Sequence, residues 1–194
     1  CKALTANTTG ANNTAVGLDA LKANTTGNQN VAIGMEALIK NTTASNNVAI
    51  GIAASGCNTT GANNTAVGTQ ASQTNTTGTE NTAVGCKALF GGTTASYNTA
   101  VGNIALDLNT TGSSNTSIGQ SAHGAAQTGS CNTAVGRAAG NNVTTGNNNI
   151  TIGYESGTDA VRTINSGNNN IVLGNNSSAT AHIKIDWTVT SDLR

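Results

Sequence analysis

One short motif returns at a fixed interval along the chain, and this spacing constrains the fold more than any other feature. Asn13-Thr14-Ala15-Val16-Gly17 recurs with variation, and each unit runs to the residue before the next motif asparagine. The nine units begin at Asn13, Asn30, Asn47, Asn64, Asn81, Asn98, Asn115, Asn132 and Asn149. A further copy begins at Asn170 instead of at Ser166, where the constant interval would place it, so four residues are inserted between Thr158 and Ser166. A period without drift indicates that each unit forms one turn of a quasi-one-dimensional structure.

The second to fourth positions of each unit predict a short β-strand. The second and fourth positions carry Thr or larger branched and aliphatic residues, and the third is mostly small, which is the alternation of a strand. We expect the second and fourth positions to point inward. The fourth would then form a core ladder of Val16, Ile33, Ile50, Val67, Val84, Val101, Ile118, Val135, Ile152 and Leu173. The eighth position is Ala from Ala20 through Ala139, which suggests close approach of another backbone or subunit.

The rest of the unit is typical of turns. In the recurring Asn-Thr-Thr-Gly segment, Asn can bond to nearby backbone and Gly can take positive φ, and we expect the glycine after each strand to do the same. The sequence therefore predicts an all-β fold, a parallel β-solenoid or β-roll of about ten 17-residue rungs. Residues 1–174 would form this shaft. Residues 175–194 would form a capping strand, from the alternation between Ala181 and Val189, and a junction segment.

Each unit has few apolar side chains to offset the conformational entropy lost on folding. Burial of a second face, which carries the recurrent eighth-position alanine, against other copies of the chain would add to the stability of the fold. We therefore expect an oligomer, either intertwined or side by side, and favour a homotrimer.

The Asn-Thr-Ala-Val-Gly-x-x-Ala unit resembles the left-handed parallel β-roll repeat in the heads of trimeric autotransporter adhesins. Those repeats are a few residues shorter, and the additional Asn-Thr-Thr-Gly is closer to repeats of phage and other viral tail fibres. The resemblance covers Cys1 to Gly174. The segment from Trp187 to Arg194 is similar to the junction before the intramolecular chaperone domain of phage tail spikes and endosialidases. That resemblance implies chain cleavage between Ser191 and Asp192, although this sequence departs from the pattern by continuing to Arg194.

Composition argues against several other classes. Eight basic and eight acidic residues give a formal net charge of zero, so we expect no nucleic-acid partner, and no apolar run approaches the length for membrane insertion. The acidic residues are isolated and the glycines form no phosphate loop, so we expect no enzyme, cofactor or metal. Neither His123 nor His182 has a carboxylate or cysteine in a neighbouring matched register. The four cysteines contain no Cys-x-x-Cys pair, which leaves small buried or half-buried thiols or bonds between chains or fibres.

Thirteen Asn-x-Ser/Thr sequons occur in the chain. Because the repeat and its turns already require Asn and Thr, most of these sequons can be accidental. Glycosylation would fit best at the turns, where the candidate sites are Asn7, Asn24, Asn41, Asn58, Asn75 and Asn109.

These features favour a non-catalytic structural fibre shaft of an extracellular appendage, most of all a virus tail fibre or attachment fibre. Its partners would be copies of itself, in a trimer or end to end, and a host-cell surface glycan or receptor. The alternatives are a bacterial surface adhesin or extracellular filament, an ice-binding solenoid, and a polysaccharide-cleaving tail spike. The lack of clustered carboxylates argues against the last of these.

Overall fold

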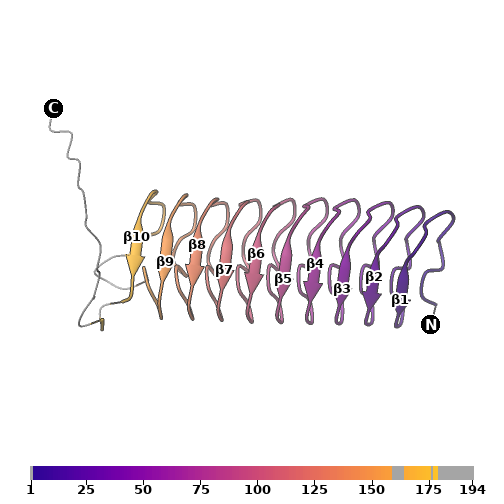
Figure 1. The fold of residues 1–194 in the computed structure, drawn as a ribbon, viewed down its shortest axis with the longest axis horizontal. Helices are drawn as coiled ribbons and strands as arrows, with labels where there is room; N and C mark the ends of the chain where they lie inside the picture. The colour runs from indigo at the N-terminus through magenta and orange to yellow at the C-terminus, as the bar shows by residue number, and fades with distance from the viewer. Residues whose placement is uncertain (1, 159–163, 176, 179–194) are drawn as a thin grey trace, which may run out of the picture.

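The chain winds into a single parallel β-solenoid in a computed structural model, which describes residues 2–158, 164–175 and 177–178. Each turn contributes one strand of three residues. The strands are β1 (Thr14–Val16), β2 (Val31–Ile33), β3 (Val48–Ile50), β4 (Thr65–Val67), β5 (Thr82–Val84), β6 (Thr99–Val101), β7 (Thr116–Ile118), β8 (Thr133–Val135), β9 (Ile150–Ile152) and β10 (Ile171–Leu173). They form one ten-stranded sheet in chain order, seen as a row of arrows in Figure 1. The predicted all-β parallel solenoid is confirmed.

Neighbouring strands pair in the register that the repeat predicts. Val16 lies beside Ile33, Ile33 beside Ile50, and Ile50 beside Val67, and the same step continues through β10. The four-residue insertion before β10 leaves the register unchanged, because Ile150 still pairs with Ile171. Successive units therefore stack one above another over the full length of the sheet.

The prediction that this ladder forms the core is wrong. Val16 is 57% exposed and Ile33 38%, and the ladder residues from Val16 to Leu173 are all exposed or half-buried. The third position faces inward instead, since Ala32, Ala49 and Ala66 are fully buried. The physical reason is the small bore of so short a turn, in which opposite walls lie too close together for a branched side chain on every rung.

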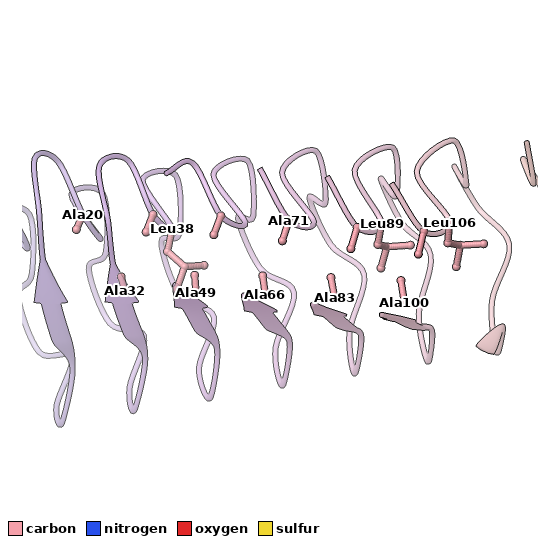
Figure 2. Packing of buried hydrophobic residues seen from close by; sticks show 14 of the residues in the cluster. Ala20, Ala32, Leu38, Ala49, Ala66, Ala71, Ala83, Leu89, Ala100 and Leu106 are labelled. Atoms are coloured by element: carbon pink, nitrogen blue, oxygen red, sulfur yellow. The ribbon is translucent and has the colours of Figure 1, made fainter. Parts of the chain in front are cut away.

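The core is therefore narrow and lined mainly by alanine. Alanines of the third and eighth positions face one another across the bore, and leucines such as Leu38, Leu89 and Leu106 fill the space between them (Figure 2). The eighth-position alanines from Ala20 to Ala139 are buried within their own chain. Their small size reflects close approach of the chain to itself, so the expected contact with a second subunit does not use them.

Buried asparagines join successive turns in a first ladder at repeat position 1. The backbone N–H of Asn64 donates to Oδ1 of Asn47 at 2.9 Å, and Oδ1 of Asn64 accepts the N–H of Asn81 at 3.0 Å. Nδ2 of Asn64 donates to the carbonyl of Gly78 at 2.9 Å. Because both ends of the amide are used, each asparagine satisfies backbone groups that the strands leave unpaired.

A second asparagine ladder runs through the Asn-Thr-Thr segments. Nδ2 of Asn41 donates to Oδ1 of Asn24 at 2.9 Å and to the carbonyl of Ala44 at 3.0 Å. The second bond is the local turn contact that the sequence predicts, and the first links one turn to the next. This ladder continues through Asn58 to Asn75, and Gly92 then takes the next asparagine position.

Tight winding forces three residues of a typical turn into the left-handed region. In the second turn these are Glu36, Leu38 and Asn46, with φ of 59°, 50° and 61°. Leucine rarely adopts this conformation, and the solenoid imposes it here against local preference. The glycines after the strands have the predicted positive φ, as at Gly51 (133°). Gly27, in an Asn-Thr-Thr-Gly turn, does not, and its lack of a side chain instead admits the carbonyl of Ala44.

Some predictions lie outside the described residues. They are the alternation from Ala181 to Val189, the proposed cleavage at Ser191 and Asp192, His182 and Cys1.

Candidate functional site

The outward side of the sheet is the surface on which the repeat gathers apolar side chains. The second and fourth positions of every strand point away from the bore, opposite the buried third position. We call this surface the sheet face. Its fourth-position column is aliphatic in all ten strands, and its second-position column is Thr in six strands and Val or Ile in four.

The sheet face has the size of the largest apolar patch on a typical monomer. Ten strands about 4.8 Å apart give a length of roughly 45 Å, and the two columns with their side chains give a width of roughly 10 Å. The resulting area of about 450 Å² lies within the range of the largest apolar patch on a typical monomer, which is often functional. The fourth-position column is continuously aliphatic, because the strands keep one register throughout.

The sixth position, two residues beyond the fourth, extends the apolar character at one end of the solenoid. Leu18, Met35 and Ile52 occupy it in the first three turns and are all exposed. Farther along the chain the same position becomes polar, with Asn103 and Arg137. The first three turns are therefore the most apolar part of this surface.

Charged side chains pair locally on the surface. Lys22 lies 3.1 Å from Asp19, and Arg137 lies 3.6 Å from Glu155. Nη1 of Arg137 also donates to the Tyr154 hydroxyl at 2.8 Å, with the guanidinium 5.1 Å from the centre of that ring. Exposed pairs of this kind contribute little to stability. Within the described residues no three His, Cys, Asp or Glu side chains gather where they could hold a metal ion.

The two threonines of each Asn-Thr-Thr segment differ in environment. Oγ1 of Thr59 donates to the carbonyl of Thr76 at 2.9 Å, and Thr59 is half-buried. Thr60 is exposed, and its hydroxyl has no hydrogen-bond partner among the described residues. The two threonines therefore differ in exposure, so these turns do not present the paired threonine columns of a flat Thr-x-Thr surface.

Five of the six candidate glycosylation sites in the turns have buried asparagine side chains. Asn24, Asn41, Asn58, Asn75 and Asn109 are at most 2% exposed, and Nδ2 of each donates a hydrogen bond inside the solenoid. Asn7 is half-buried, and its Nδ2 donates to the carbonyl of Gly10. A glycan is attached through Nδ2, so the folded solenoid excludes it at the five buried sites. At these five sites the prediction is wrong, because the same Asn-Thr-Thr pattern that resembles a sequon places the asparagine side chain inside the solenoid.

The described cysteines are free thiols. Cys57 is half-buried, whereas Cys86 and Cys131 are exposed. The expectation of buried or half-buried thiols holds for Cys57, whereas the exposed Cys86 and Cys131 do not fit it. Cys86 occupies the sixth repeat position, beside the sheet face.

His123 occupies the core position at which other turns carry leucine, and its side chain has a hydrogen-bond partner. Its Nδ1 lies 2.9 Å from Oγ of Ser117, which stands where most turns carry alanine. Gly140 in the next turn provides the room, because a Cβ there would lie 2.7 Å from Nε2 of His123. The imidazole is fully buried, and Nε2 has no hydrogen-bond partner among the described residues. Burial lowers the pKa of His123 from 6.5 to about 4.

This burial predicts a loss of stability in acid. Between pH 6.5 and about 4 the unfolded chain binds a proton at His123 that the folded chain does not, so stability falls as the pH decreases through this window. We expect the loss to reach about 2 kcal/mol at pH 5 relative to pH 7.5. Denaturant unfolding at the two pH values measures it. The double variant Ser117→Ala/His123→Leu restores the usual residues and should remove that part of the pH dependence; an unchanged loss would contradict the assignment.

No helix long and apolar enough to cross a membrane occurs among the residues with a described structure. No protein-family model, no curated protein and no solved structure matches the chain. The resemblance to adhesin and tail-fibre repeats therefore remains a prediction from the motif.

Proposed function

We propose that this chain is a non-catalytic structural shaft of an extracellular appendage, in which three copies associate side by side through their sheet faces. The observation that carries the proposal is the uninterrupted aliphatic column at the fourth position, exposed or half-buried in all ten strands. A repeat that needed only a stable single solenoid could place polar side chains there, because the position does not face the core.

The composition of the interior supports association. Alanine, asparagine and glycine dominate the core, so a single chain buries little of its larger aliphatic surface. The remaining Val and Ile side chains would be removed from water by contact between copies, with about 25 cal/mol gained per Å². In a closed symmetric assembly of parallel copies, equivalent residues meet around one axis and no sheet face is left open.

The shape of the molecule supports a spacer role. The ten strands lie in one row along the long axis, so the length of the rod follows directly from the number of repeats (Figure 1). Repeated surfaces along such a rod can bind a host-cell glycan or receptor by multivalent contacts. The placement on a virion, as a tail fibre or attachment fibre, follows from the motif resemblance. A cell-surface adhesin or filament is the alternative setting.

Charged substitutions on the sheet face test the association. The double variant Ile33→Asp/Ile50→Asp places two carboxylates on adjacent strands, and we expect it to dissociate the assembly to single chains in sedimentation equilibrium. Because both side chains are 38% exposed, each chain should stay folded, with an unchanged circular dichroism spectrum.

The matched control is Thr43→Asp/Thr60→Asp, which adds the same charges in the same two turns at exposed positions away from the sheet face. It should leave the mass of the assembly unchanged. Equal dissociation of both variants, or of neither, would contradict association through the sheet face.

A further inference from the structure

The leucine column at repeat position 9 is interrupted by two serines. Leu21 and Leu38 occupy this position in the first two complete turns, and Leu89 and Leu106 in the fifth and sixth. Between them the position is Ser55 and then Ser72, which are 2% and 1% exposed. Each serine has two side-chain heavy atoms where leucine has four, so two consecutive turns fill less of the bore.

The backbone stacks in the same way at the two serines as at the neighbouring leucines. The N–H at this position donates to the next turn at 3.0 Å from Leu38, 2.9 Å from Ser55 and 2.9 Å from Ser72. The strands of these turns also keep the common register. The opposite wall carries only alanine, as Ala49, Ala66 and Ala83 in Figure 2 show. The local backbone conformation is also unchanged, with φ of 50° at Leu38, 47° at Ser55 and 50° at Ser72, so the turns keep the same shape with serine as with leucine.

Both serine hydroxyls are buried, and neither has a hydrogen-bond partner among the described residues. Equivalent atoms on successive turns lie about 4.8 Å apart, which is too far for a direct bond between hydroxyls. The same separation suits one water molecule that lies about 2.8 Å from each oxygen. Burying a hydroxyl without a partner is costly, whereas buried water regularly satisfies such groups.

His123 shows the other way in which this chain fills the same position. There the polar side chain is paired directly, because Ser117 replaces the third-position alanine of its turn. The turns of Ser55 and Ser72 retain Ala49 and Ala66, which offer no hydrogen-bonding side chain. Only a bound molecule can then connect the two hydroxyls.

We propose that Ser55 and Ser72 form an internal water-binding site, with a water molecule bridging their hydroxyls inside the solenoid. The site is independent of how copies of the chain associate. The site separates the leucine pair of Leu21 and Leu38 from the pair of Leu89 and Leu106, and each pair packs against alanine.

A crystal structure at a resolution that defines ordered water tests the site. We expect a density peak within hydrogen-bond distance of Oγ of both Ser55 and Ser72. If both hydroxyls instead donate to carbonyl oxygens of their own turns with no density between them, the proposal is wrong.

Two double variants give an independent readout. Ser55→Leu/Ser72→Leu completes the leucine column, and we expect it to displace the water and raise the thermal midpoint by at least about 4 °C. Ser55→Ala/Ser72→Ala removes the hydroxyls without filling the space, so its midpoint should not rise. A midpoint that falls in the leucine variant would show that the space is absent and would overturn the site.

Discussion

Replacing Gly51 by alanine will lower the free energy of unfolding by about 4 kcal/mol. Gly51 has a φ of 133°, which is strained for any residue with a side chain, and an added Cβ would lie 2.5 Å from the carbonyl oxygen of Gly68. Relieving that contact would stretch the bonds from Gly51 N–H to Ile33 (2.8 Å) and from Gly68 N–H to Ile50 (2.7 Å). Urea unfolding followed by circular dichroism measures the change.

The control for this substitution is Gly56→Ala. Gly56 does not have a positive φ, and other repeats carry Ile39 and Gln73 at its position. An added Cβ there would lie 3.3 Å from the carbonyl oxygen of Ala53, so little has to move. We expect a loss within about 1 kcal/mol. Equal losses at Gly51 and Gly56 would show that the positive φ and the close carbonyl after the strand are not what requires glycine.

Replacing Asn64 by alanine will cost about 3 kcal/mol. The substitution removes the acceptor of the Asn81 N–H, which is left buried without its partner, and it removes the bond from Nδ2 to the Gly78 carbonyl. Because both groups lie between turns, we expect the loss to appear also as faster amide hydrogen exchange in the turns on either side. Unfolding by urea and exchange followed by mass spectrometry measure the two effects.

The adjacent Asn63 provides the matched control. It is exposed and left-handed with a φ of 59°, and Ser114 occupies the equivalent position with a φ of 60°. We expect Asn63→Ser to change stability by less than about 0.5 kcal/mol. If Asn63→Ser were as harmful as Asn64→Ala, the ladder would not be the source of the effect.

The register of the sheet could be predicted from the sequence. Which side of the sheet faces the bore could not. The constant interval between motif copies determines that Val16 stacks on Ile33, and the structure confirms this. Alternation along one short strand shows only that the second and fourth positions share one side. Choosing the inner side requires the width of the bore, which depends on the conformation of every residue in the turn.

The roles of the asparagines also required the structure. The sequence predicts that Asn41 bonds to its local turn, and it does, but its bond to Asn24 in the previous turn depends on stacking. Asparagine occupies position 1 in all ten copies, which indicates a structural role beyond that of a local turn residue. The left-handed conformation of Leu38 had no comparable signal, because local preference opposes it.

Association through the sheet face is tested most directly by electron cryomicroscopy of the unmodified protein. We predict a particle of three parallel solenoids, with a mass three times the 19.1 kDa of one chain and with all three sheet faces turned to a common axis. Val16, Ile33 and Ile50 would then lie in the interior of the particle. A single solenoid whose sheet face remains in contact with solvent at micromolar concentration would contradict the proposal.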